Sequence, residues 1–365
     1  MIRLAKPNIT EEAIAAVADV LRSGNLVQGK YVQLFEQKLA EYLEVENAIV
    51  VTSGTAALHL SLIALDIKKG DEVIVPAFTF PATANVVELV GATPKFVDIN
   101  LDDLCINTDL IEAAITDKIV AIMRVHEFGQ AAKMDDILSI CKKHNLMLIE
   151  DAACALGAEF NNKKVGTFGD LGCFSFHPRK AITTGEGGVI TTNDNALAKK
   201  VRALRNHGME LENGKIEFNY AAYNYRMTDF QAVLGVYQLE DFDKQIKLRQ
   251  KLAELYDKLL ANIDWIITPK VFDNRKMTYQ TYHIIVRDDI DRDSLIKKLN
   301  DHGIQANYGA QAVNIQKYYA EKYNVSRKQL PMAYNAFRKG IALPLGDFLN
   351  ENDILKVCKV IDDYE

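Results

Sequence analysis

The sequence predicts an α/β protein built on a mostly parallel sheet, followed by a smaller α/β domain. From residue 48 to residue 190, short β-branched runs alternate with helical patterns. This alternation is typical of βαβ units, in which helices cover both faces of a parallel sheet. The length of 365 residues also favours two domains. We place the large domain at 1–240 and the small domain at 241–365.

Each expected element follows from its local pattern along the chain. The apolar periodicity of EEAIAAVADVLRS predicts a helix over 11–23. Expected strands, rich in β-branched residues, are 48–52, 71–76, 93–99, 118–125, 146–152, 172–176 and 188–192. Expected helices between them are 55–66, 80–91 and 134–145. After residue 226, a long and nearly uninterrupted helical stretch precedes a strand at 280–286 and helices at 293–303 and 352–364.

The composition excludes several classes of protein. With 48% hydrophobic and 25% charged residues, the chain is globular rather than disordered. The net charge of −6 argues against nucleic acid or an anionic membrane as a partner. Five cysteines without a CxxC pair exclude a disulfide framework and a cysteine-type zinc site, and the histidines lack metal-ligand spacing, so no metal is expected. Without a recognisable targeting segment, the chain is expected in the cytoplasm.

One motif is misleading. Residues 24–30 read GNLVQGK, which matches the core of a phosphate-binding P-loop. However, Tyr31 follows where a P-loop needs Ser or Thr for Mg²⁺, and the preceding segment is a predicted helix instead of a strand. No G-x-G-x-x-G follows the first strand either. Neither a nucleoside-triphosphatase site nor a dinucleotide site is therefore predicted.

Polar residues follow two predicted strands, at the carboxyl edge where open α/β sheets bind ligands. After the first strand, Ser53, Gly54 and Thr55 begin a helix whose backbone amides can bind an anion. The alternative is that a hydroxyl there only caps the helix. The strand at 146–152 carries Glu150 and Asp151 near its end. A buried acid needs a cationic partner, which a protonated pyridine nitrogen or a structural ion pair would supply.

Lys180 lies in a turn rich in Gly and Thr between the last two strands of the series. Burial would lower the pKa of its amine and make it a good Schiff-base nucleophile, whereas an exposed lysine is the alternative. An anion site, a carboxylate for a ring nitrogen and a reactive lysine are the protein groups that pyridoxal 5′-phosphate (PLP) requires. Together they predict a PLP site.

A series of motifs identifies the family that the chain resembles. SGTAALHLSL (53–62), PAFTFPATANVV (76–87), IEDAACALGA (149–158), SFHPRKAITTGEGG (175–188) and YNYRMTDFQAVLG (223–235) resemble, in order, motifs of the DegT/DnrJ/EryC1/StrS sugar aminotransferases. SGNLVQGKYVQLFEQKLAEYL (23–43) and IALPLG (341–346) fit as well. The resemblance covers nearly the whole chain. It implies a fold-type I PLP enzyme similar in architecture to aspartate aminotransferase.

The resemblance implies a role for each matching residue of the cofactor site. Lys180 would form the Schiff base with PLP and move the proton, and Asp151 would keep the ring nitrogen protonated. Phe80 would stack on one face of the ring, with Ala153 at the other. The residues expected to bind the phosphate are Thr55, Ala56 and Ser175.

Other matching residues are expected to bind substrate or to act between subunits. Asn224 would reach the phosphate of the neighbouring subunit's cofactor, which requires a homodimer with shared active sites. Arg226 would contact the nucleotide diphosphate of the substrate, and His177 lies beside the site. Gly29, in the N-terminal motif, is a further candidate for substrate binding. Tyr308 lies in a turn that either borders the sugar pocket or is an ordinary surface turn.

Two positions depart from the pattern of many relatives. Cys154 stands where Gln or His would lie near the phenolic oxygen of PLP, and a thiol donates hydrogen bonds only weakly. Asn25 stands where Trp is common, so substrate approach is expected to differ. A dehydratase subgroup carries His in place of the Schiff-base lysine. Because Lys180 is present here, transamination is favoured.

The sequence therefore predicts a PLP-dependent aminotransferase. By resemblance, it takes an amino group from L-glutamate and gives it to a nucleotide-linked 3- or 4-keto sugar or deoxysugar, in two ping-pong half-reactions. Amino-sugar and polysaccharide biosynthesis is the expected setting. The alternatives are a PLP-dependent sugar dehydratase and a non-catalytic PLP-binding regulator of the same fold.

Overall fold

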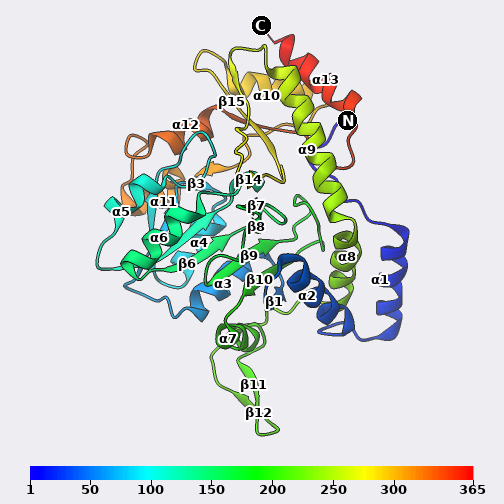
Figure 1. Ribbon diagram of the computed structural model, residues 1–365, viewed down its shortest axis with the longest axis vertical. Helices are drawn as coiled ribbons and strands as arrows, with labels where there is room; N and C mark the ends of the chain where they lie inside the picture. The colour runs from blue at the N-terminus through cyan, green and yellow to red at the C-terminus, as the bar shows by residue number, and fades with distance from the viewer. Residues whose placement is uncertain (365) are drawn as a thin grey trace.

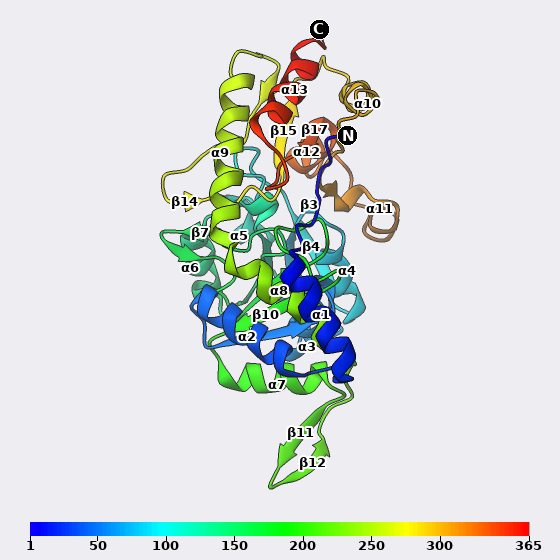
Figure 2. The same cartoon turned by 90° about the vertical axis from the view of Figure 1, so that its right-hand side faces the viewer.

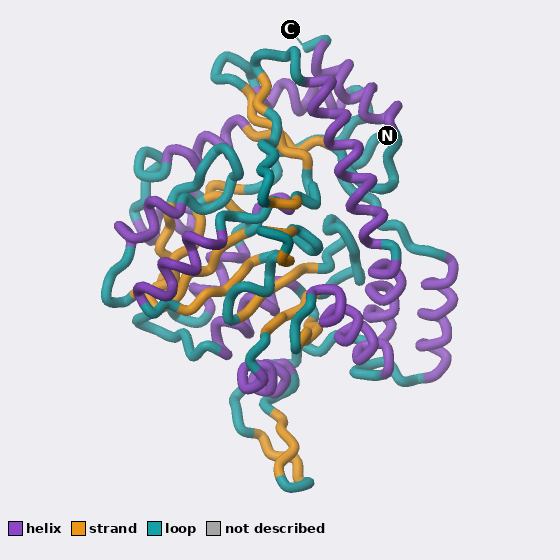
Figure 3. Tube along the Cα trace, viewed as in Figure 1, coloured by secondary structure: helices purple, strands orange, loops and turns teal. Residues whose placement is uncertain are grey.

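A seven-stranded, mostly parallel sheet forms the centre of the molecule (Figures 1 and 3). The structure is a computed structural model that describes residues 1–364. In spatial order the strands are β1 (Asn47–Val51), β10 (Gly188–Thr192), β9 (Leu171–Ser175), β6 (Met147–Asp151), β5 (Ile119–Val125), β2 (Glu72–Pro76) and β4 (Thr93–Val97). In this sheet β10 alone runs antiparallel to its neighbours. The carboxyl ends of the other strands therefore meet at one edge.

The helices that the sequence predicts around this sheet are present, with ends shifted by a few residues. They are α1 (Glu11–Ser23), α3 (Gly54–Ala64), α4 (Ala82–Leu89) and α6 (Met134–His144). Additional helices are α2 (Lys30–Leu43), α5 (Ile111–Ala114), α7 (Asn195–Arg205), α11 (Lys317–Tyr323) and α12 (Pro331–Lys339), with short 3₁₀ turns η1 (Thr108–Leu110), η2 (Glu127–Gly129) and η3 (Val313–Ile315). Within residues 1–364, no helix is both long and apolar enough to span a membrane.

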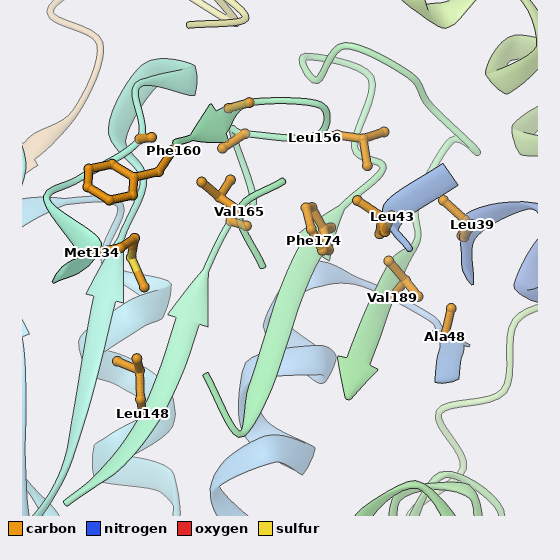
Figure 4. Close-up of a cluster of buried hydrophobic side chains, with 14 of the residues drawn as sticks. Leu39, Leu43, Ala48, Met134, Leu148, Leu156, Phe160, Val165, Phe174 and Val189 are labelled. Atoms are coloured by element: carbon orange, nitrogen blue, oxygen red, sulfur yellow. The ribbon is translucent and has the colours of Figure 1, made fainter. Parts of the chain in front are cut away.

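Helices cover both faces of the sheet because successive side chains of a strand point to opposite faces. Ile49 of β1 belongs to a buried cluster with residues of α3, α4 and α7. Val50, the next residue, belongs to a cluster on the opposite face with residues of α2 and α6. In Figure 4, Leu39 and Leu43 of α2 lie beside the strands that carry Phe174 and Val189. The site at the sheet edge thus rests on a core packed from both sides.

The long helical stretch expected after residue 226 is two helices, α8 (Asp229–Glu240) and α9 (Phe242–Leu260), which meet at Asp241. At Asp241 the ψ angle of 11° departs from helical geometry. Helix α9 begins in the core on one face of the large sheet, to which it contributes Phe242 and Ile246. It continues into a second core, to which it contributes Leu252 and Tyr256. The predicted boundary between 240 and 241 coincides with this break, and it stays a prediction.

The second core surrounds a small antiparallel sheet. Its strands are β13 (Ile266–Ile267), β15 (Tyr282–Val286) and β17 (Gly340–Leu343), and helices α10 (Arg292–Asp301) and α13 (Glu351–Asp362) contribute to the core. The predicted strand and helices of this region are therefore present. Ile2 near the N-terminus belongs to the same core, and its backbone amide donates to the Gly303 carbonyl at 2.8 Å. The remaining short strands are β3 (Phe78–Thr79), β7 (Glu159–Phe160), β8 (Lys163–Lys164), β14 (Arg275–Lys276) and β16 (Gln311–Ala312).

A β-hairpin that is absent from the predicted elements projects from the body below α7 (Figures 1 and 2). It consists of β11 (Met209–Glu212) and β12 (Lys215–Phe218). Its turn residues Asn213 and Gly214 have φ of 50° and 77°, as a type I′ turn requires. The Asn-Gly pair was the sequence signal for this hairpin. Leu211 and Phe218 leave 73% and 67% of their surface exposed.

Candidate active site

A cavity of about 480 Å³ opens at the carboxyl edge of the central sheet. The residues that follow β1, β5, β6 and β9 form much of its wall, as expected for an open α/β sheet. The far wall includes Gln280, Gly309 and Leu343 from the region of the small sheet. Of the residues predicted for the site, the cavity brings together Thr55, Phe80, Asp151, Cys154, Ser175, His177 and Lys180.

The first residues of α3 form one end of the cavity. The Ser53 hydroxyl caps this helix by accepting from the backbone amide of Ala56 at 3.0 Å. Ser53 therefore caps the helix and the Ala56 amide already has a partner, whereas phosphate binding at this helix start stays a prediction. Gly54 allows the helix to approach Ser175 closely, because a Cβ at Gly54 would lie 2.7 Å from the Ser175 Cβ. Thr55 is exposed and lines the cavity.

Asp151 lies at the end of β6 and is only 4% exposed. Its carboxylate accepts from the Thr83 hydroxyl at 2.8 Å and from the Ala153 amide at 3.1 Å. Burial raises the pKa of Asp151 despite these two donors. A cation facing this carboxylate from the cavity would favour its charged form and lower the pKa again. Thr83, which was not among the predicted residues, thus fixes the orientation of Asp151.

The neighbouring Glu150 is structural, because its side chain leaves the strand on the opposite face. It is fully buried and accepts from the backbone amides of Gly166, Phe168 and Gly169 at 2.7–2.9 Å. Burial lowers the pKa of His126 to about 3, so the neutral ring donates to Glu150 at 2.9 Å. Burial disfavours the charge of Glu150, but the His126 hydrogen bond and the other donors outweigh it and hold the pKa at about 2. Glu150 is therefore held by hydrogen bonds, and the structural ion pair considered as the alternative is not what surrounds it.

Lys180 follows β9 and points its amine at Cys154, with Nζ 2.9 Å from Sγ. It is half-buried, so the alternative of an exposed lysine is wrong. The expected lowering of its pKa is also wrong. Burial alone lowers the pKa, but Cys154 and the acids Asp151 and Glu127 outweigh it and raise the pKa. Burial raises the pKa of Cys154, so this residue is a neutral thiol.

Phe80 and His177 lie at the more open parts of the cavity. The Phe80 side chain is 68% exposed although it lines the wall. His177 accepts from the Arg179 backbone amide through Nδ1 at 3.2 Å, and its Nε2 lies 4.0 Å from Glu186. Ala153 also lines the cavity, next to Cys154. The ring-stacking and substrate-binding roles of these residues stay predictions.

Asn224 and Arg226 lie outside the cavity of their own chain. Their segment runs along the free edge of β1, where the Thr52 amide donates to the Tyr225 carbonyl at 3.1 Å. The Arg226 guanidinium donates to the Asn206 side chain, and Asn224 pairs with the Asn206 backbone. The predicted reach of Asn224 into a neighbouring subunit stays a prediction.

Gly29 and Tyr308 also lie outside the cavity. Gly29 precedes α2, and a Cβ there would lie 2.6 Å from the carboxylate of Asp229, which accepts from the Val32 amide. The close approach of Asp229 explains why residue 29 is a glycine, since a side chain would not fit there. The Tyr308 ring packs against Phe337, 5.7 Å between centroids, whereas the next residue, Gly309, lines the cavity.

Glu127 was not predicted, yet it lines the same cavity and is only 4% exposed. It lies two residues after the end of β5, at the edge where the sequence predicted Asp151. The same rule, a polar residue following a buried strand, would have found it. Within residues 1–364 no cluster of three or more His, Cys, Asp or Glu residues could hold a metal ion.

The residues present fit PLP. The start of α3 with Thr55 and Ser175 offers backbone amides and hydroxyls to a phosphate. Burial raises the pKa of Asp151, and a pyridinium nitrogen facing the carboxylate would offset this effect. Lys180 presents its amine to the same cavity.

The fold and the site define an α/β enzyme of the PLP-dependent aminotransferase class. Residues 7–362 match the DegT/DnrJ/EryC1/StrS aminotransferase family, and the chain belongs to this family. The resemblance given by the sequence motifs is thereby confirmed.

Individual relatives are similar over nearly the whole chain. The GDP-perosamine synthase of Caulobacter vibrioides is 40% identical over 337 residues, which are 92% of this chain and 90% of that protein. The putative sugar aminotransferase Spr1654 from Streptococcus pneumoniae, solved in a PMP form and a PLP form, has a TM-score of 0.94 at 29% identity and covers 99% of this chain and 97–98% of its own. Helicobacter pylori PseC, an aminotransferase involved in pseudoaminic acid biosynthesis, has a TM-score of 0.94 at 30% identity, covering 99% of this chain and 98% of its own.

Proposed function

We propose that this chain transfers an amino group from L-glutamate to a nucleotide-linked 3- or 4-keto sugar or deoxysugar. The observation that carries the proposal is the convergence of Lys180, Asp151 and the start of α3 on one cavity. The similarity to a GDP-perosamine synthase supports a nucleotide-linked sugar as the acceptor. The family membership supports amino transfer as the reaction.

PLP is the cofactor. When bound, it supplies an aldehyde that reacts with amines and a ring that withdraws electrons. Thr55, Ser175 and the amides that begin α3 would hold its phosphate. Asp151 would face the ring nitrogen, and the amine of Lys180 would face the aldehyde.

The protein's own groups perform two tasks. Asp151, oriented by Thr83 and the Ala153 amide, favours a proton on a nitrogen that faces it. Lys180 takes a proton from carbon and returns it, acting as general base and then general acid. Its half-buried position limits the access of water to that proton.

The function is tested by adding L-glutamate to the yellow, PLP-loaded protein. We expect the colour to bleach as the amino group arrives, with one 2-oxoglutarate released per site. Lys180→Ala should lose this half-reaction, whereas Lys163→Ala, on the short strand β8 outside the cavity, should retain it. If glutamate leaves the colour unchanged, glutamate is not the donor. If Lys180→Ala completes both half-reactions at normal rates, the role of Lys180 is wrong.

The acceptor is tested with the amino-loaded protein. Nucleotide-linked 3-keto and 4-keto sugars are added one at a time, and recovery of the yellow colour marks an acceptor. NMR of the product then shows which carbon carries the nitrogen. Recovery with 2-oxoglutarate but with none of the keto sugars would contradict a sugar acceptor.

We also propose that two copies share their active sites, with Asn224 and Arg226 acting on the partner's cavity. Both lie on the outer edge of β1, outside their own cavity, which supports this arrangement. Mixing Lys180→Ala with Asn224→Ala tests it, because a mixed dimer regains one intact site if Asn224 acts in trans. Light scattering gives the number of chains. A mixture without recovery, although chains exchange, would contradict sharing.

A further inference from the structure

Glu127 is a buried acid whose charge is poorly compensated. It lines the cavity with Lys180 and Asp151 and is only 4% exposed. Its Oε2 is buried without a hydrogen-bond partner in residues 1–364. Such an oxygen carries a desolvation penalty when the group is ionised. Unlike Glu150, whose oxygens accept from three backbone amides and His126, this Glu127 oxygen accepts no hydrogen bond within residues 1–364.

The backbone around Glu127 holds the residue at the cavity wall. Phe128, the next residue, has φ of 52° and ψ of 18°, a left-handed conformation that a bulky side chain rarely adopts. Its ring stacks on His283 of β15, with 4.6 Å between centroids. Gly129 has φ of 89°, and a Cβ there would lie 2.5 Å from the Thr278 hydroxyl. Both contacts come from the region of the small sheet and leave the turn little freedom.

We propose that Glu127 is a positioning residue that acts through Lys180. The Glu127 carboxyl group keeps its proton at neutral pH. When Glu127 loses this proton, it becomes a second carboxylate that holds Lys180 as an ammonium ion. The inference rests on the proposed role of Lys180 as the group that moves the proton. An amine that must alternate between base and acid needs a pKa that is not too high. While Glu127 is neutral, the groups that raise the pKa of Lys180 are Cys154 and, after it, Asp151.

The electrostatic surroundings support this role. Burial raises the pKa of Glu127 to about 8, although the nearby Lys180 opposes the shift and Asp151 adds to it. The effect is mutual, since Glu127 is among the groups that raise the pKa of Lys180. The other titratable or charged groups that line the cavities bordered by Glu127 are Cys154, His177, Arg179 and Glu186 on one side and Asp102, Asp103, Lys270 and His283 on the other.

The test measures the titration of Lys180 in the full-length chain without cofactor. Trace acetic anhydride labels only the uncharged amine. Mass spectrometry of the peptide that contains Lys180 follows the labelling between about pH 7 and pH 11, the range in which lysines titrate. In Glu127→Gln we expect the midpoint for Lys180 to fall by about one pH unit, so labelling at pH 9 should be about tenfold faster than in the wild type. Glu112→Gln, which removes an exposed acid paired with Lys143, is the matched control and should match the wild type. Coinciding curves for Glu127→Gln and wild type would overturn the proposal.

A second measurement needs no variant, so it applies even if Glu127→Gln does not fold. Carboxyl ¹³C NMR of the wild type, labelled at glutamate, should show one glutamate with a midpoint near pH 8. A spectrum in which every glutamate is ionised by pH 6 would overturn the proposal. Both measurements are independent of turnover. A failed glutamate half-reaction with a shifted Lys180 curve would reject the proposed donor alone, whereas a normal half-reaction with an unshifted curve would reject the role of Glu127 alone.

Discussion

The amine of Lys180 lies 2.9 Å from the thiol of Cys154, so the residue that departs from the pattern of many relatives touches the residue proposed to do the chemistry. The two come from different strand ends, β6 and β9, and meet only because those strands are parallel neighbours. A thiol is a weak donor and acceptor. It therefore leaves the Lys180 amine less firmly held than an amide or imidazole would.

Replacing Cys154 with glutamine should change the spectrum of the bound cofactor more than the rate. A side-chain amide donates a stronger hydrogen bond to a nearby oxygen than a thiol does. We expect a shifted absorbance band in Cys154→Gln, with the glutamate half-reaction kept within about tenfold, since one neutral hydrogen bond contributes about 1 kcal/mol. Cys141→Ala, in α6, is a control that should leave the band in place. Identical spectra for Cys154→Gln, Cys154→Ala and wild type would place residue 154 away from the cofactor.

Asp151→Asn should retain the fold and lose most of the chemistry. The amide can still accept from Thr83, but it no longer carries the charge that favours a proton on the facing nitrogen. We expect the glutamate half-reaction, followed by stopped-flow absorbance, to slow by ~10²-fold or more. The effect should be much smaller in Thr83→Val, which removes one donor and keeps the charge. Equal losses in the two variants would mean that Asp151 acts through its hydrogen bonds rather than its charge.

Glu150→Ala should damage stability instead of chemistry. It leaves three backbone amides and the His126 ring without their acceptor in a fully buried setting. Loss of one partner from a buried charged network costs about 3 kcal/mol or more of unfolding free energy. Urea unfolding measures this loss. A variant as stable as the wild type would show that the turn at 166–169 does not depend on Glu150.

The stability of the cofactor-free chain should depend on Glu127 in a defined pH window. Burial raises the pKa of Glu127 from 4.5 to about 8, so the folded chain keeps a proton that the unfolded chain has lost. Stability relative to Glu127→Gln should therefore be highest below pH 4.5 and fall as the pH rises to about 8. Thermal unfolding at about pH 5, 6, 7 and 8 measures the difference in stability between the wild type and Glu127→Gln. These pH values cover the window of about 4.5 to 8 in which the difference should change. A constant difference across the series would contradict a raised pKa.

Sequence patterns predicted the sheet and most of its helices because each pattern is local. A β-branched run such as 118–125 or an amphipathic run such as 11–23 carries its own signal. The hairpin Met209–Phe218 was missed although its Asn-Gly turn was visible, and the long helix was predicted as one because nothing local marks Asp241 as a break. Lys180 and Asp151 were found by motif, since chemistry demands those residue types.

By itself, the sequence determined the alternation of strands and helices, the lysine and the pair of acids at 150 and 151. The motif resemblance assigned the cofactor role to Asp151, and the tertiary structure gives the physical reason why the cavity receives this acid and not Glu150. Side chains on a strand alternate between faces, so Asp151 points to the cavity while Glu150 binds the turn at 166–169. The tertiary structure also brought Glu127, Cys154 and Lys180 together, because three separate parallel strands end at one edge. Burial there raises the pKa of Glu127 and Cys154, whereas the neighbouring groups raise that of Lys180.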